Sequence, residues 1–268
     1  MHRCAAACIA VVALSATLKS EQAAAGDGVD RPLALRFDEA AARAGYTTFL
    51  NSGTAALNVS VIAENGGQLT LGRPRLASSG DHAVRYPAYS SAADAPHAVI
   101  QIRDRSGTDD LNPGTREIVF GADFRLNRVS EDDPPGGRDN GDNVLQRGLY
   151  DQQSQYKVQV DHRIAMCRVK GSAGVLTVAS SGSPVEPGVW YRVRCRRSGE
   201  TLAIRLTTWQ DGVATSVLDT VTGPTGDVSP ARRSVPVSVG GKLAKADVIA
   251  NTTDQFNGRV DNVVIKIG

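Results

Sequence analysis

Aromatic side chains are scarce in this sequence of 268 residues, in which Phe, Trp and Tyr together make up 5%. An excess of charge of either sign is also missing, because 30 Lys and Arg stand against 28 Asp and Glu. Domains that bind nucleic acid through bulk charge usually carry a clear basic excess, so the composition argues against a nucleic-acid partner. Wholesale disorder is excluded as well, since 41% of the residues are hydrophobic and the net charge is only +2.

Long hydrophobic runs are absent too. The uncharged apolar run from Cys4 to Leu14 is too short to cross a bilayer about 30 Å thick, which takes about 20 apolar residues. His2 and Arg3 precede this run, and small residues (Ala23 to Ala25) follow it, as in a signal peptide with its cleavage site. We therefore predict a secretory signal peptide over residues 1–25 and a short linker over 26–31. The protein is then secreted and extracellular, without membrane insertion after signal cleavage; an N-terminal anchor helix is the alternative.

Cysteine is rare, with four residues in the whole chain. Cleavage after Ala25 would remove Cys4 and Cys8 and leave Cys167 and Cys195. Two cysteines in an oxidising compartment most simply form a disulfide, so we predict a Cys167–Cys195 bridge. The alternative is two separately buried thiols.

Helical periodicity is lacking beyond residue 30. Apolar and polar residues alternate instead, for example over residues 156–160, 191–196, 202–207 and 263–267, and glycine-rich turns separate these runs. This pattern predicts an all-β protein, an antiparallel sandwich or barrel, in a single domain over residues 32–268. In this alternation Cys195 shares a face with Val193 and Cys167 shares one with Val169. Two inward-facing cysteines on neighbouring strands would then reach bridging distance.

Several segments in the second half of the chain occur in the order typical of a known family. Residues 143–148 (Asn-Val-Leu-Gln-Arg-Gly), 155–160 (Gln-Tyr-Lys-Val-Gln-Val) and 188–193 (Gly-Val-Trp-Tyr-Arg-Val) resemble the middle of a laminin-G-like domain. Residues 256–263 (Phe-Asn-Gly-Arg-Val-Asp-Asn-Val) resemble its last strand, and the paired cysteines resemble secreted actinobacterial members. The resemblance covers residues 115–268 well and residues 32–114 loosely. It implies a concanavalin-A-like jelly-roll β-sandwich, whose concave sheet commonly carries the ligand.

The same superfamily contains enzymes, but their motifs are incomplete here. Glycoside hydrolases need two carboxylates across the scissile bond, and the nearest match to Glu-x-Asp-x-x-Glu, residues 131–136, ends in glycine. Jelly-roll lyases carry histidine where this chain has Arg103 after Gln101 and Ile102. We therefore expect a non-catalytic binding module for a glycan or a cell-surface protein. The alternatives are a diverged polysaccharide lyase or glycoside hydrolase, and a structural module without a small ligand.

The resemblance also implies a calcium ion that ties the first strand of the domain to the last. Asp261 matches the aspartate of the closing strand, and Asp38 or Glu39 lies near the start of the domain. Calcium takes six to eight oxygen ligands, which carboxylates and carbonyls at strand ends supply. The alternative is an Asp261 that only accepts hydrogen bonds from backbone amides.

Polar side chains on the middle strands are the candidates for ligand contact. We expect hydrogen bonds to a sugar chain from Gln146, Arg147, Lys157 and Gln159, and a stacking plane from Trp209. Arginines over residues 192–205 form a basic stripe, which could meet acidic glycans or merely protect a strand edge from aggregation; they are Arg192, Arg194, Arg196, Arg197 and Arg205.

Overall fold

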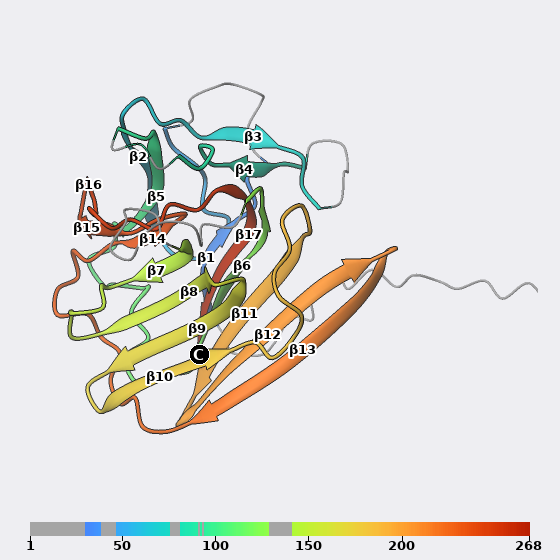
Figure 1. The fold of residues 1–268 in the computed structure, drawn as a ribbon. Helices are drawn as coiled ribbons and strands as arrows, with labels where there is room; N and C mark the ends of the chain where they lie inside the picture. Colours follow the sequence, from blue (N-terminus) through green and yellow to red (C-terminus); the bar gives the residue numbers. More distant parts are fainter. Residues whose placement is uncertain (1–29, 39–46, 76–80, 91, 93, 129–140) are drawn as a thin grey trace, which may run out of the picture.

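The computed structural model describes residues 30–38, 47–75, 81–90, 92, 94–128 and 141–268, so the predicted signal peptide (1–25) and Glu39 lie outside the described residues. Within these ranges the regular structure is entirely β, which confirms the all-β prediction (Figure 1). No helix long and apolar enough to span a membrane occurs in the part of the chain that the structure describes. The strands are β1 (Asp30–Leu35), β2 (Leu57–Glu64), β3 (Thr70–Gly72), β4 (Ala83–Arg85), β5 (His97–Asp104), β6 (Ile118–Leu126), β7 (Asp142–Arg147), β8 (Gln155–Asp161), β9 (Ile164–Gly171), β10 (Gly174–Ala179), β11 (Tyr191–Ser198), β12 (Thr201–Gln210), β13 (Val213–Thr222), β14 (Val237–Val239), β15 (Leu243–Lys245), β16 (Val248–Ile249) and β17 (Gly258–Ile267).

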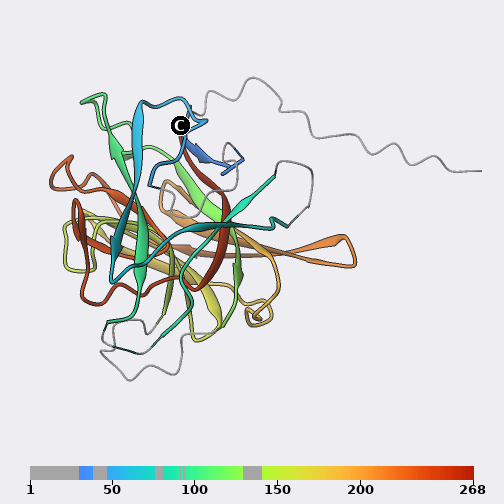
Figure 2. The ribbon, with the colours of Figure 1, turned by 90° about the horizontal axis from the view of Figure 1, so that it is seen from above.

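Two antiparallel sheets form the sandwich. The eight-stranded sheet has the order β13-β12-β11-β6-β17-β4-β3, with β1 also paired to β17. The seven-stranded sheet has the order β10-β9-β8-β7-β14-β5-β2, and β15 and β16 form a separate hairpin. In Figure 1 the strands β7 to β10 lie side by side as one layer, while β11 to β13 belong to the other. Seen from above in Figure 2, the β12–β13 hairpin extends away from the rest of the molecule.

The core lies between the two sheets and consists of the residues that the alternation assigns to one face. On β8 the side chains of Tyr156, Val158 and Val160 are buried there. On β11 the same holds for Tyr191 and Val193. Because successive side chains of a strand point to opposite faces, their polar neighbours must lie on the outer surfaces.

The disulfide joins the two sheets through this core. Cys167 of β9 and Cys195 of β11 are bonded, with 5.8 Å between their Cα atoms, and both are fully buried. The predicted pairing is confirmed. The expectation that the two strands are neighbours is wrong, because β9 lies in the seven-stranded sheet and β11 in the eight-stranded sheet. The bond therefore crosses the sandwich.

The first part of the domain completes both sheets. β1 begins at Asp30, within the segment that the sequence assigns to a linker, and its pairing with β17 brings the first strand beside the last. β3 and β4 extend the eight-stranded sheet, and β2 and β5 extend the other. The strands β1 to β5 therefore belong to the two sheets of the sandwich.

Arg197 departs from the outward stripe that the sequence suggests. It is 1% exposed and donates hydrogen bonds to the carbonyl oxygens of Gly114, Thr115, Arg116 and Gly226, at 2.8–3.0 Å. A buried guanidinium offers five N–H donors, so this one side chain satisfies several carbonyls of two loops at the end of β11. Its role is structural.

Removal of the disulfide tests its contribution to stability. We expect the double variant Cys167→Ala/Cys195→Ala to lose at least about 3 to 4 kcal/mol of unfolding free energy, because the bond closes a loop with a sequence separation of 28. Urea denaturation followed by fluorescence measures this loss, and a far-ultraviolet spectrum should still show β-structure. An unchanged urea midpoint would contradict the structural role of the bridge.

Candidate ligand-binding groove

A row of polar side chains crosses the outer face of the seven-stranded sheet. The antiparallel register places Gln146 of β7 opposite Lys157 of β8, and Lys157 opposite Arg168 of β9. The same register continues to Thr177 on one side and to Ser238, Gln101 and Ser60 on the other. We call these residues the polar row: Thr177, Arg168, Lys157, Gln146, Ser238, Gln101 and Ser60.

The β15–β16 hairpin covers one end of the polar row. Asp247 in the hairpin turn accepts a hydrogen bond from Gln101 Nε2 at 2.8 Å, and its backbone N–H donates to Gln101 Oε1 at 2.7 Å. Leu243 and Ile249 of the hairpin pack on Val99 in a small apolar cluster outside the main core. The hairpin therefore closes the face over β5 and leaves the part over β7 to β10 open.

Two hollows lie in this open part, and Gln146 lines both. The first hollow has a volume of about 350 Å³ and lies between Tyr150 and Ala250, with Lys157, Gln159 and Arg168 in its lining. The second hollow has a volume of about 550 Å³ and lies between the loop at Ser234 to Pro236 and the β15 segment. We call the two hollows together the groove. Its shape suits an extended ligand that passes over Gln146.

Gln146, which lines both hollows, has a side-chain oxygen without a hydrogen-bond partner. The residue is 2% exposed, and its Nε2 donates to the carbonyl oxygen of Gly148 at 2.6 Å. Its Oε1 is buried and has no hydrogen-bond partner. A buried polar atom without a partner typically costs about 1 to 3 kcal/mol, and a hydroxyl donor from a ligand would remove this cost.

Lys157 supplies a nearly buried ammonium group beside Gln146. It is 8% exposed, and its Nζ lies 3.9 Å from Oδ2 of Asp254, which Lys242 Nζ approaches more closely, at 2.5 Å. Burial lowers the pKa of Lys157 to about 8, and the nearby Lys242 adds to this effect while Asp254 opposes it. The lysine is therefore a largely buried cation whose contact with the Asp254 carboxylate is long.

Tyr150 provides an exposed aromatic surface at the rim of the first hollow. The residue is 75% exposed and follows the turn at Gly148, which has a φ of 80°. The Arg168 guanidinium lies 4.7 Å from its ring centroid, and Arg168 Nε also donates to Gln155 Oε1 at 2.9 Å. An amphipathic ring next to polar donors is typical of ligand sites that combine apolar and polar contacts.

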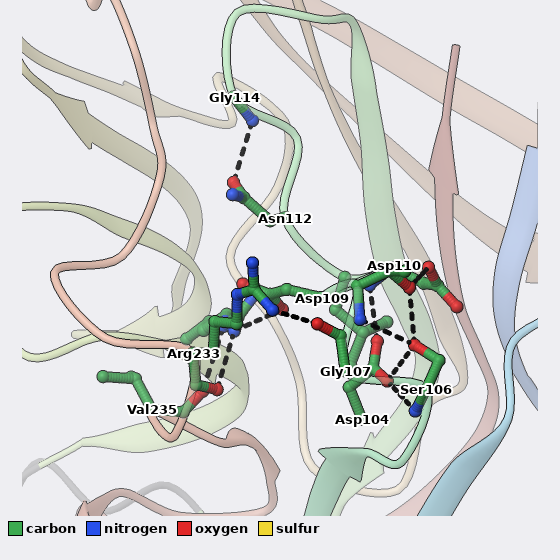
Figure 3. A network of polar contacts seen from close by, with 12 residues as sticks. Asp104, Ser106, Gly107, Asp109, Asp110, Asn112, Gly114, Arg233 and Val235 are labelled. Atoms are coloured by element: carbon green, nitrogen blue, oxygen red, sulfur yellow. Dashed lines mark hydrogen bonds and ion pairs between the residues drawn. The ribbon is translucent and has the colours of Figure 1, made fainter.

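The structure brings together some of the predicted ligand residues and separates others. Gln146, Lys157 and Gln159 line the first hollow. Arg147 instead points to the opposite face of β7, where it is 4% exposed and its Nη2 donates to Asp109 Oδ1 at 2.7 Å. Its Nε donates to the carbonyl oxygen of Val235 at 3.1 Å, within the polar network around Asp109 and Arg233 drawn in Figure 3. Arg147 thus serves the fold and not the groove.

Trp209 lies on β12 in the eight-stranded sheet, away from the groove. The guanidinium groups of Arg75 and Arg192 lie 3.9 Å and 5.6 Å from its ring centroid. These cation–π contacts place the indole among arginines, and neither hollow of the groove contains it.

Four further residues line the first hollow but were not predicted from the sequence. They are Tyr150, Gln155, Arg168 and Lys242.

The outward arginines of β11 contact two carboxylates on the outer face of the eight-stranded sheet. Arg192 makes two hydrogen bonds to Asp123, at 2.7 and 2.8 Å, and Arg194 approaches the same carboxylate at 3.3 Å. Arg196 pairs with Glu117 at 2.8 Å. Arg192 and Arg194 thus share one carboxylate, and Arg196 has a carboxylate of its own.

The predicted calcium residues lie at the junction of β1 and β17. Asp261 is 2% exposed, and its carboxylate accepts hydrogen bonds from the backbone N–H and the side-chain amide of Asn262, at 2.6 and 3.1 Å. Burial, together with the neighbouring carboxylates of Asp123, Asp81 and Asp38, raises its pKa to about 8. Asp38 accepts a hydrogen bond from the His82 backbone at 3.3 Å.

The donor chemistry at this junction suits calcium, but the arrangement does not yet form a cage. Among the described residues, no group of three acidic, histidine or cysteine side chains is placed to hold a metal ion. Asp261 also has the amide contacts that the alternative interpretation expects. Calcium binding therefore stays a prediction, and Glu39 lies outside the described residues.

Comparisons with known proteins agree on the fold. No family model and no curated protein matches the sequence. Domain 4 of AbnA, a GH43 extracellular arabinanase from Geobacillus stearothermophilus, solved with arabinotriose, is similar in structure at a TM-score of 0.54 and 10% identity, over 90% of this chain and 94% of that one. The binding domain of botulinum neurotoxin DC, solved with rat synaptotagmin II, also has a TM-score of 0.54, at 11% identity, over 88% of this chain.

The chain spans 48% of that neurotoxin binding domain. The LG1-3 region of the laminin alpha2 chain matches at a TM-score of only 0.41 and 9% identity, over 89% of this chain and 60% of that one, which is too low to support an argument. At these identities the likeness shows the fold alone. The protein is an antiparallel β-sandwich of the jelly-roll type, as the sequence predicts.

The lowered pKa of Lys157 predicts a pH-dependent stability. In the folded state its pKa is about 8 and in the unfolded state it lies near the ordinary 10.5, so the unfolded chain binds more protons between these values. The destabilising contribution of the charged lysine is full below pH 8 and fades as the pH rises toward 10.5. Lys157→Met should therefore gain stability over the wild type at pH 7, and this gain should shrink by pH 10 in urea titrations. An equal gain in stability at pH 7 and pH 10 would contradict the lowered pKa of Lys157 in the folded state.

The calcium prediction is tested by thermal melting. If Asp261 and Asp38 ligate the ion, calcium raises the melting temperature and EDTA lowers it, because ligand binding to the native state stabilises that state. Asp261→Asn should abolish the response, since the amide removes the negative charge. Identical melting curves of the wild type with calcium and with EDTA would contradict calcium binding.

Proposed function

We propose that this protein is a secreted, non-catalytic carbohydrate-binding module that holds a glycan chain in the groove. The observation that carries the proposal is the unpartnered Oε1 of Gln146, a residue that lines both hollows. A sugar hydroxyl can donate to this oxygen. It can also accept hydrogen bonds from the neighbouring ammonium and amide groups of Lys157 and Gln159.

Tyr150 supports a sugar ligand from the rim. Sugar rings expose C–H groups that pack on aromatic faces, and a tyrosine that is 75% exposed offers such a surface beside the polar floor. An extended groove with a polar floor and a single aromatic at its edge favours moderate affinity for a chain over tight binding of one small molecule. Domain 4 of AbnA, which has a similar fold, was solved with arabinotriose, and this supports a glycan for the present chain as well.

Among the described residues, the acidic side chains needed for glycoside hydrolysis are not gathered in the groove. A glycosidase uses two carboxyl groups about 5 to 10 Å apart across the scissile bond. Of the described residues that line the two hollows, Asp151 alone carries a carboxylate, and it is exposed at the rim. We therefore favour a binding function over a catalytic one. Secretion is supported by the buried disulfide, since such bonds persist in oxidising compartments.

Calorimetric titration with a panel of oligosaccharides tests this function. For the best ligand, we expect Gln146→Leu to weaken affinity about tenfold, because about 1.4 kcal/mol from a lost hydrogen bond corresponds to that factor. Tyr150→Ala should weaken it by a similar factor through loss of the ring contact.

A matched control for Tyr150→Ala is Tyr89→Ala. Tyr89 also has an arginine over its ring, with Arg128 at 4.5 Å from the centroid, but it lines neither hollow. Its substitution should leave glycan affinity unchanged. Absence of binding to any glycan in the panel would overturn the proposal, and release of reducing or unsaturated ends would show that the protein is an enzyme instead.

A further inference from the structure

Positive charge exceeds negative charge along the groove. The first hollow is lined by Lys157, Arg168 and Lys242, against the exposed carboxylate of Asp151 at its rim. The second hollow is lined by Arg232 and Lys245, and no Asp or Glu is found among its described lining residues. This local excess contrasts with the near-neutral chain as a whole, whose net charge is +2.

Two of these cations lie directly opposite each other. Lys157 of β8 and Arg168 of β9 are register partners on the same outer face, and like charges in this position destabilise an antiparallel pair. Arg168 contacts neutral groups, since it donates to Gln155 and Thr177 and lies over the Tyr150 ring. The sheet thus keeps an unfavourable cation pair in its open half.

The nearest carboxylate does not neutralise this pair. Asp254 lies 2.5 Å from Lys242 Nζ but 3.9 Å from Lys157 Nζ, so one carboxylate is shared by two ammonium groups. Lys157 is nevertheless nine-tenths buried. A buried cation with incomplete pairing is costly unless an anion is present.

We propose that the glycan held in the groove is acidic, and that an anionic group of one sugar binds between Lys157 and Arg168 on the floor of the first hollow. This inference rests on the proposed function and adds the chemical class of the ligand. Neighbouring hydroxyls reach Gln146 Oε1, and the chain continues into the second hollow beside Arg232 and Lys245. In the arginine stripe of β11, Arg192 and Arg194 also share one carboxylate, but both lie closer to it, at 2.7 and 3.3 Å from Asp123, than Lys157 lies to Asp254, at 3.9 Å.

The anionic group can be the carboxylate of a uronic acid or a sulfate ester, and the test has an arm for each. Calorimetry compares polygalacturonate and alginate, which carry carboxylates, with carrageenan, which carries sulfate. Arabinan and agarose serve as neutral polymers. We expect at least one acidic polymer to bind at least tenfold more tightly than the neutral ones at 50 mM NaCl, and this preference to shrink at 300 mM NaCl because salt screens charges.

Charge-removing variants locate the anion. Lys157→Met and Arg168→Gln should each weaken binding of the acidic polymer about tenfold and weaken binding of neutral polymers by a clearly smaller factor, since only the acidic polymer also loses the charge attraction. Arg205→Gln is the matched control, since Arg205 is exposed on β12 in the other sheet and its loss removes the same charge. Thermal melts check that each variant is folded.

The pH dependence gives an independent readout of the same site. The groups that act on Lys157 are Asp254, Lys242, Asp161 and Arg168, and its pKa in the free protein is about 8. Affinity for the acidic polymer should fall as the pH rises above 8, because the deprotonated amine no longer attracts an anion. In Lys157→Met this fall should disappear.

The outcomes separate the inference from the proposed function. Equal or tighter binding of neutral polymers, with the Gln146→Leu effect intact, would overturn the acidic ligand and leave a neutral-glycan module. A loss in Arg205→Gln as large as in Lys157→Met would show non-specific attraction and also overturn it. Binding of no polymer of either kind would overturn the proposed function itself.

Discussion

The antiparallel register of β7, β8 and β9 is the constraint on which both the core and the groove depend. One set of register partners, Leu145, Val158 and Cys167, faces the core, and the adjacent set, Gln146, Lys157 and Arg168, faces outward. A slip of one residue would exchange the two faces, burying the cations and exposing the cysteine that joins the sheets. The disulfide between β9 and β11 therefore supports the register that also assembles the polar row.

The groove exists because the outer face is only partly covered. The β15–β16 hairpin packs over β5, and Asp247 in its turn hydrogen-bonds to both polar atoms of the Gln101 side chain. The hairpin does not do the same for Gln146, the glutamine farther along the polar row. Gln146 and Lys157 remain with an unused acceptor and an incompletely paired ammonium. Residues that lower stability in this way are common where a protein meets its ligand, because the ligand supplies the missing partners.

Much of the fold could be predicted from the sequence, since period-two alternation and turn residues mark the strands from residue 156 onward, and two remaining cysteines allow one pairing. Alternation also placed Lys157 and Gln159 on a polar face, and Gln146 was selected as a polar residue on a middle strand. It could not show that Arg147 is buried, because its partner Asp109 is distant in the chain. Tyr150 was missed because it follows a strand, and Trp209 was assigned to the site because a sequence does not reveal which of two sheets carries a strand. In residues 32–114, β3 and β4 are only three residues long, and the strands pair with distant segments, such as β2 with β5 and β4 with β17, so local patterning marks them weakly.

The most direct measurement is a crystal structure of the protein with an acidic oligosaccharide of four to six sugars. The account predicts the chain across β7 to β10, with an anionic group between the Lys157 ammonium and the Arg168 guanidinium and a hydroxyl on the Gln146 side-chain oxygen. An oligosaccharide seated on the outer face of the eight-stranded sheet, around Trp209 and the β11 arginines, would contradict it.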